Sequence, residues 1–208
     1  MKKYLLVAGD FIKTGGMDRC NFALADHLAR SKAELHLVSH RLDKELLNYP
    51  NVTFHKVPKP LNSDLLGLPL IDIYGQAYAR KILRAGGRVL VNGGNCNVHD
   101  INWVQHLQCA DAINLPPSRL KKIHRWICYK IYLAQEARIV PKAKLLFTLC
   151  HKNKNDLIKY LNIDAERIHV VYPAIDPGLF LPISPDASQR IRRMLTFPAG
   201  SPGCCSGP

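Results

Sequence analysis

The sequence predicts an α/β fold, with a doubly wound, mainly parallel sheet that carries helices on both faces. Short apolar runs of strand length alternate along the chain with segments of helical periodicity, which is the order expected when helices connect parallel strands. Most of these apolar runs do not alternate with polar residues, as is typical of strands buried on both faces. The chain of 208 residues is therefore expected to be one domain of this class with a short C-terminal extension.

The first two elements follow from local pattern. Tyr4–Ala8 is an apolar run that ends at Gly9 and Asp10, and it is too short for the core of a signal peptide. We therefore expect a buried strand there. Residues 18–31 are expected to form a helix, because apolar side chains recur at helical spacing at Phe22, Ala25, Leu28 and Ala29.

The remaining elements continue the alternation. Further strands are expected at residues 34–39, 52–57, 88–92, 102–107, 144–149 and 168–172. Further helices are expected at residues 71–85, 118–139 and 154–161. The segment 58–69 contains three prolines and one glycine and is expected to be a loop.

The C-terminal residues differ from the rest. A short helix is expected after Ser184 and through Leu195, whereas Thr196–Pro208 has three prolines, three glycines and no periodicity. We expect a domain at residues 1–183, followed at 184–208 by the start of a linker and an irregular tail.

Composition excludes several classes of protein. Hydrophobic residues make up 47% of the chain and charged residues 22%, which excludes a disordered protein. No apolar run is long enough to span a bilayer, and scattered cysteines that suit free thiols favour a cytoplasmic location. The seven cysteines form no Cys-x-x-Cys pair, which argues against a disulfide framework and against a metal site.

Gly15 and Gly16 form the first candidate site, because they lie between the first strand and the first helix. Glycines at this position let the backbone approach a ligand, and the helix N-terminus attracts an anion. A phosphate or a sugar hydroxyl would suit the site. The pattern is neither a dinucleotide-binding fingerprint nor a Walker A loop, and a Gly-Gly pair can also be a simple turn.

The second candidate site is the polar segment 92–108, which follows a predicted strand at the edge where open α/β sheets bind ligands. Its titratable side chains are His99 and His106, and histidine suits acid or base chemistry near neutral pH. Either histidine can instead be structural.

A third feature is the basic stretch at residues 117–159, which carries eleven Lys and Arg against two Asp and Glu, a net +9 of the chain's +13. Basic residues interleaved with aromatic ones suit an anionic membrane surface, and also nucleic acid. The alternative is a solvated basic face whose apolar stripe packs on the core. That stripe is expected at Leu120, Ile123, Ile127, Ile131 and Ala134.

These features together resemble the N-terminal domain of a GT-B glycosyltransferase of the retaining family four, over about residues 3–182. The opening resembles the family's strand, Gly-Gly loop and helix at residues 14–28. The end of the domain is more specific, with Glu136-Ala137-Arg138, residues 143–150, residues 154–158, Arg167–Asp176 and Phe180-Leu181-Pro182.

The resemblance implies a Rossmann-like domain that supplies the acceptor side of a hexosyltransferase. It implies no cofactor or metal, with a nucleotide diphosphate sugar as co-substrate and a lipid, glycan or small molecule as acceptor. His106 is the implied catalytic residue, and the implied substrate-binding residues are Gly15, Gly16, Asn95, His99 and Gln105.

Two departures from the family pattern stand out. Cys150 occupies a position where serine is usual, and Gln105-His106-Leu107-Gln108 replaces a His-Tyr-Val-His pattern, with its histidine displaced by one residue. On a strand, that displacement would turn the side chain to the opposite face. Family members also have a second, donor-binding domain, so the chain resembles a truncated enzyme that is expected to be weakly active or inactive alone.

Two alternatives to an enzyme remain at this point. One is a non-catalytic module that docks on an anionic membrane or a partner chain through Lys121, Lys122, Arg125 and Trp126, at the inner membrane face. The other is a nucleic-acid binder, which rests on net charge alone because the sequence has no nucleic-acid motif.

Overall fold

The computed structural model describes residues 2–111, 118–174 and 184–194. The chain divides into two units, residues 1–173 and residues 174–208. In the second unit the described element is helix α5 (Pro185–Met194), close to the predicted short helix. All other elements belong to the first unit.

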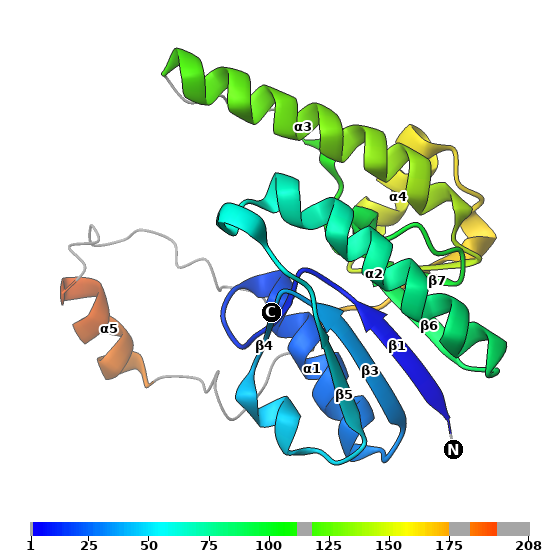
Figure 1. Ribbon diagram of the computed structural model, residues 1–208. Coiled ribbons are helices and arrows are strands. Elements are labelled where there is room, and N and C mark those ends of the chain that lie inside the picture. Colours follow the sequence, from blue (N-terminus) through cyan, green and yellow to red (C-terminus); the bar gives the residue numbers. More distant parts are fainter. Residues whose placement is uncertain (1, 112–117, 175–183, 195–208) are drawn as a thin grey trace. The chain divides into compact units, whose positions relative to one another are not determined.

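The first unit is built on a seven-stranded parallel sheet (Figure 1). Its strands are β1 (Lys3–Val7), β3 (Glu34–Ser39), β5 (Val52–Lys56), β6 (Arg88–Asn92), β7 (Ile101–Val104), β8 (Leu145–Thr148) and β9 (Ile168–Val170). They lie in the order β5-β3-β1-β6-β7-β8-β9. A parallel pair of two-residue strands, β2 (Asp10–Phe11) and β4 (Arg41–Leu42), stands beside this sheet. Every predicted strand is present, and the predicted fold class is confirmed.

Helices cover both faces of the sheet. Helix α1 (Gly16–Arg30) buries Phe22, Ala25 and Ala29 against Leu35 and Leu37 of β3. Helix α2 (Asp64–Arg84) packs on the opposite face, where its apolar side chains meet β1 and β6. Helices α3 (Arg119–Ile139) and α4 (His151–Leu161) follow later in the chain, and Leu157 of α4 packs in a core beneath β7, β8 and β9.

The predicted loop at 58–69 is wrong over its second half, because α2 already begins at Asp64. A short 3-10 turn occupies Pro60–Asn62, and Ser63 caps the helix, with its carbonyl accepting a hydrogen bond from the Gly67 N–H at 2.9 Å. Pro69 lies only six residues into the helix, so its missing N–H removes one bond near a terminus where several are unmade in any case. The prolines and glycine of this segment therefore led to a predicted helix start at residue 71, about two turns after the observed start at Asp64.

The expected core-facing stripe of α3 is also wrong for its described members, whereas the Leu120 side chain lies outside the described part of the structure. Ile123, Ile127 and Ile131 are 58%, 43% and 39% exposed, and Trp126 is 51% exposed. Helical periodicity shows that a helix has an apolar face, but it does not show that the face turns toward the sheet. The N-terminal half of α3 instead presents this face outward.

Candidate functional site

A polar cavity of the described chain lies at the carboxyl edge of the sheet, where the strand order reverses between β1 and β6. Strands added after β1 run to one side, and strands from β6 onward run to the other. Open α/β sheets bind ligands at such a switch point, because the loops that leave neighbouring strands there diverge. The cavity has a volume of about 520 Å³. We call it the main cleft.

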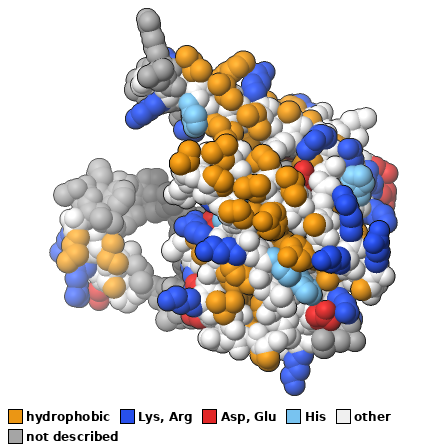
Figure 2. Space-filling view, viewed as in Figure 1, with side chains coloured by type: hydrophobic (Ala, Val, Ile, Leu, Met, Phe, Trp, Pro, Cys, Tyr) orange, Lys and Arg blue, Asp and Glu red, His pale blue; other side chains and the backbone are white. Residues whose placement is uncertain are grey.

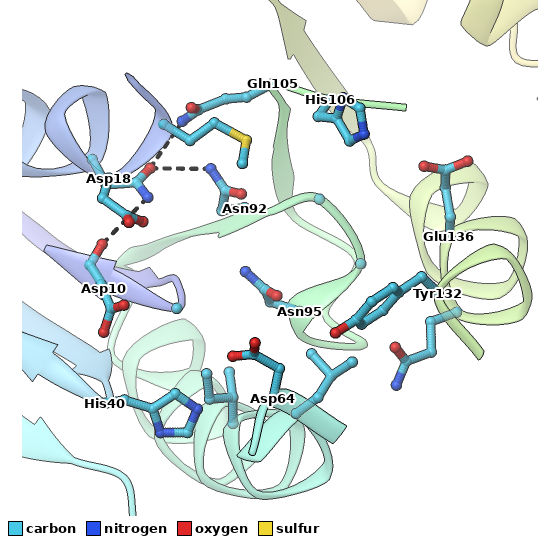
Figure 3. Close-up of a pocket in the computed structure, with 18 of the residues that line it drawn as sticks. Asp10, Asp18, His40, Asp64, Asn92, Asn95, Gln105, His106, Tyr132 and Glu136 are labelled. Carbon is cyan, nitrogen blue, oxygen red and sulfur yellow. Dashed lines mark hydrogen bonds between the residues drawn. The ribbon is translucent and has the colours of Figure 1, made fainter. Parts of the chain in front are cut away.

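The walls of the main cleft come from segments far apart in the sequence (Figure 3). Gly9 and Asp10 follow β1, residues 92–95 form the end of β6 and the turn after it, and Gln105, His106 and Gln108 follow β7. Helix α1 contributes its first turns, α2 its N-terminal half, and α3 the side chains of Tyr132, Gln135 and Glu136. Amides, carboxylates and an imidazole thus converge on one hollow.

Asn21 of α1 connects three of these walls. Its side-chain oxygen accepts hydrogen bonds from Asn92 Nδ2 at 3.0 Å and from Gln105 Nε2 at 2.9 Å. Its Nδ2 donates to the carbonyl of Asp10 at 3.4 Å. Asn21 is buried, so this network fixes the ends of β1, β6 and β7 relative to α1.

Carboxylates gather at the α1 side of the main cleft, with basic side chains between them. Arg41 donates to Asp10 at 2.7 Å, and Lys59 Nζ lies 2.6 Å from Asp64 Oδ1. Burial raises the pKa of Asp18, and the neighbouring Asp10 raises it further, while Arg41 and Lys59 oppose the shift. Carboxylates accept hydrogen bonds, so this side of the cleft suits a ligand rich in hydroxyl groups.

His106 and Gln105 both line the main cleft. Strand β7 ends at Val104, short of the predicted Leu107, so the alternation of strand faces does not extend to residues 105 and 106. Gln105 is buried and donates to Asn21, whereas His106 is 45% exposed and its Nε2 lies 3.2 Å from Asp111 Oδ2. The one-residue displacement of the histidine therefore does not turn it away from the cleft.

Asn95 also lines the main cleft, on the short 3-10 turn that follows β6. Asn102 supports this loop, since its Nδ2 donates to the Gly93 carbonyl at 2.8 Å. Gly15 and Gly16 do not line the cleft, although Met17 and Asp18 directly after them do. Gly15 has a φ of 80°, a conformation that glycine adopts readily, and it is the N-cap of α1.

His99 lies away from the main cleft. It lines a separate surface hollow with Arg80, Asp100 and Lys144, before β7 and β8 rather than after them. Its ring faces Asn97, with Nε2 3.3 Å from Asn97 Oδ1. The structure therefore does not bring His99 together with the other predicted site residues.

Several residues of the main cleft were not among the sequence predictions, notably Asp10, Asp18, His40, Asp64 and Tyr132. His40 directly follows β3 and Asp10 comes three residues after the end of β1, so a position soon after a buried strand could have identified both residues. Asp64 and Tyr132 carry no such signal. Asp64 begins a helix inside a proline-rich segment, and Tyr132 lies on one face of a long helix.

Glu136 forms the α3 wall of the main cleft and serves a structural role. Its two carboxylate oxygens accept hydrogen bonds from the backbone N–H groups of Gln108 at 2.7 Å and Cys109 at 3.0 Å. Burial and this neighbouring carboxylate raise the pKa of the Cys109 thiol to about 12. Glu136 thereby holds the segment after β7 against α3.

The four residues predicted to form a membrane or partner surface all lie on α3 and are all exposed. Lys121 and Arg125 line a hollow beside the main cleft, whereas Lys122 and Trp126 do not. Figure 2 shows hydrophobic side chains gathered over α3 and α2, with lysines and arginines among and around them. The basic stretch of the sequence is thus a real surface feature.

Two features are absent from the described residues. No group of three or more His, Cys, Asp or Glu side chains among them is arranged to hold a metal ion. None of the helices in this part of the chain is both long and apolar enough to cross a lipid bilayer.

Solved structures with the same fold include three glycosyltransferases or related enzymes. WaaG, a glycosyltransferase involved in lipopolysaccharide biosynthesis, is 15% identical with a TM-score of 0.61, over 95% of this chain and 52% of WaaG. Sucrose-phosphate synthase from Thermosynechococcus elongatus is 14% identical with a TM-score of 0.57, over 97% of this chain and 54% of its own. A glycosyltransferase from Rickettsia africae is 15% identical with a TM-score of 0.51, over 97% and 51%.

The chain thus spans about half the length of these structures, and its fold is that of the N-terminal half of a GT-B glycosyltransferase. No curated protein matches the sequence. The family model of Glycosyltransferase Family 4 matches residues 14–179, which is most of the chain and includes the Gly-Gly loop and the lining of the main cleft apart from Gly9 and Asp10. The chain therefore belongs to Glycosyltransferase Family 4.

Proposed function

We propose that this chain provides the acceptor-binding half of a hexosyltransferase that uses a nucleotide diphosphate sugar. The observation that carries the proposal is the main cleft itself, a polar hollow at the switch point of the sheet in a chain of this family. Its carboxylates and amides suit the hydroxyl groups of a sugar acceptor. The donor is expected to be bound mainly by a second domain, so turnover by this chain alone should be weak or absent.

Within this proposal, His106 is the residue that acts on the reacting sugar. It lies at the rim of the main cleft, and Asp111 at 3.2 Å can orient its ring. A hydrogen bond from the imidazole to the donor sugar would offset charge that develops as the glycosidic bond to the diphosphate breaks. Asn95 and Gln105 would position the acceptor beside it, with Asp18 as a further hydrogen-bond acceptor for substrate hydroxyls.

The test is a sugar-transfer assay on the full chain joined to a donor-binding domain from a family-four relative. A panel of nucleotide sugars and glycoside acceptors should yield transfer for at least one pair, and His106→Ala should lower the rate by about 100-fold. His99→Ala is the matched control, because His99 lies outside the main cleft. Absence of transfer across the panel, or equal losses in both variants, would contradict the proposal.

We further propose that the outward apolar face of α3 attaches the protein to the surface of an anionic membrane, from the cytoplasmic side. Ile123, Trp126 and Ile127 form this face, and Lys130 Nζ lies 5.6 Å from the centre of the Trp126 ring. An exposed apolar stripe bordered by cations suits insertion between anionic headgroups. Attraction to the headgroups and burial of the stripe would act together.

Vesicle sedimentation tests this attachment. The chain should bind vesicles of phosphatidylglycerol more tightly than vesicles of phosphatidylcholine, and the double variant Ile123→Ser/Trp126→Ser should lose most of the binding. Ile158→Ser, which removes an exposed apolar side chain of α4, should leave binding unchanged. Binding that survives the double variant would contradict the proposed surface.

A further inference from the structure

A second hollow adjoins the main cleft and differs from it in charge. It has a volume of about 720 Å³ and is lined by Lys121, His124, Arg125 and Tyr129 together with Gln108 and Tyr132. Gln108 and Tyr132 also line the main cleft, so the two hollows share a wall. We call the second hollow the basic groove. None of the described residues that line it is acidic.

Helical spacing explains why the basic groove and the apolar face of α3 are distinct. Lys121, Arg125 and Tyr132 follow one another at intervals of four and seven residues, which places them on one side of the helix. Ile123, Trp126 and Ile127 fall on the other side. The same helix therefore turns cations toward the main cleft and apolar side chains toward solvent.

The cations of the basic groove lack a structural role that would explain them. Lys121 and Arg125 take part in no ion pair among the described residues, although other basic side chains of this unit do. Lys121 also lies near the N-terminus of α3, where the helix dipole disfavours positive charge, and the first turn holds no acidic residue. An anionic ligand would offset the repulsion between these cations.

The position of the basic groove indicates where such an anion would belong. A ligand whose hydroxyl groups occupy the main cleft can extend past Gln108 and Tyr132 and bring an attached anionic group to Lys121 and Arg125. Guanidinium and ammonium groups bind phosphate oxygens well, whereas the Tyr129 hydroxyl already donates to the Asp111 carbonyl at 3.3 Å.

We propose that the basic groove binds a phosphate group carried by the acceptor substrate. The assignment of this phosphate to an acceptor rests on the proposed function, whereas the binding of phosphate by the groove does not. The shared chemistry is a phosphate ester, which can be part of a soluble sugar phosphate or of a lipid headgroup. Lys121 and Arg125 are the residues that bind it.

The test measures phosphate-ester binding to the full chain by NMR titration, with glycerol 3-phosphate as probe and glycerol as its uncharged counterpart. Glycerol 3-phosphate should shift backbone amides around Lys121, Arg125 and Tyr129, and Lys121→Gln/Arg125→Gln should weaken binding by about 10-fold or more. Lys122→Gln/Lys130→Gln removes the same charge from outside the groove and should weaken it little. Equal weakening by both pairs, or no binding by the unaltered chain, would overturn the proposal.

A second arm identifies the source of the phosphate. The second probe is monomeric dihexanoyl phosphatidylglycerol. If it binds more tightly than glycerol 3-phosphate, and Lys121→Gln/Arg125→Gln weakens the binding of both, the phosphate belongs to a lipid headgroup. If glycerol 3-phosphate binds more tightly than the lipid, the phosphate belongs to a soluble ester. Lipid binding that is lost only in Ile123→Ser/Trp126→Ser belongs to the apolar face and contradicts a lipid headgroup as the source of the phosphate. Phosphate binding without sugar transfer would support the proposed role of the groove and contradict the proposed function. Sugar transfer without phosphate binding would support the proposed function and contradict the proposed role of the groove.

Discussion

At the scale of single residues, the shape of the main cleft depends on Asn21. This buried side chain receives hydrogen bonds from Asn92 and Gln105 and donates one to the Asp10 carbonyl. Each of these partners lies after a different strand. Asn21 is not among the predicted site residues, and its role follows only from the way that the strands meet.

We expect Asn21→Ala to lower the free energy of unfolding by about 1–3 kcal/mol, because it leaves the buried Gln105 donor and the half-buried Asn92 donor without an acceptor. Urea unfolding measures this change. Asn155→Ala, at an exposed position of α4, should change stability by less than about 0.5 kcal/mol. Equal stability of the two variants would show that the network contributes little.

His55 predicts a dependence of stability on pH. Burial, together with the nearby His36 and Lys81, lowers its pKa to about 4. Its Nε2 lies 2.9 Å from His36 Nδ1, its ring stacks on Tyr78 at 3.7 Å, and His36 in turn faces Glu34. Since the unfolded chain binds a proton at His55 near pH 6.5 and the folded chain only near pH 4, stability should fall as the pH drops through this range.

Unfolding titrations at several pH values between 4 and 7 test this expectation. The unaltered chain should lose stability on acidification more steeply than His55→Leu, whose residue does not titrate. Parallel curves for the two proteins would contradict the stated protonation of His55.

The sequence identified only part of the candidate site at this scale. Asn95, Gln105 and His106 were placed correctly near the carboxyl ends of β6 and β7, because polar residues after buried strands mark that edge. His99 belongs to the same polar segment, yet it lies before β7 and faces a different hollow. The segment that connects two parallel strands runs from the carboxyl edge of the sheet back to its amino edge. Composition does not show which residues of the segment lie at each edge.

At the scale of elements, α2 approaches the sheet closely through Gly75. A Cβ atom added there would lie 2.6 Å from Cys96 Sγ and 3.1 Å from Val7 Cγ1, and both neighbours are buried. The glycine thus brings the helix against β1 and the loop after β6. The proline-rich segment that leads into α2 hid the start of this helix in the sequence, whereas the strands were evident from their apolar runs.

Gly75→Val should destabilise the fold by about 1–3 kcal/mol, since the added methyl groups have no space between α2 and the sheet. Thermal unfolding is a sufficient measure. Gly16→Ala is the matched control, because a Cβ at Gly16 meets no atom within 4 Å. A Gly75→Val protein as stable as the control would mean that α2 packs less closely than described.

Helix α3 shows a different limit of sequence reasoning. Its charge was evident from the sequence, but the direction of its apolar face was not, because that depends on where the helix lies relative to the sheet. Few of the described residues pack against the N-terminal half of α3, so Ile123 and Trp126 remain exposed. The two sides of this helix have separate proposed roles, one toward the membrane and one toward a phosphate.

At the scale of the whole molecule, the arrangement of strands determines the site. The alternation of strands and helices predicts a parallel sheet, but it does not give the order β5-β3-β1-β6-β7-β8-β9. That order puts the switch point between β1 and β6 and so joins Asp10, Asp18 and Asn95 in one cleft. The strand order depends on which strands pair although they are distant in sequence, and local sequence patterns do not contain that information.

The most direct test of this account is an NMR map of sugar binding to the chain, with a panel of methyl hexosides as soluble acceptor analogues. The account predicts that at least one hexoside shifts backbone amides around Asp18, Asn95, Gln105 and His106, and that the shifts vanish in a variant with Asn95→Ala and His106→Ala. Shifts confined to the hollow around His99, or none for any hexoside at millimolar concentration, would contradict the assignment of the main cleft as the acceptor site.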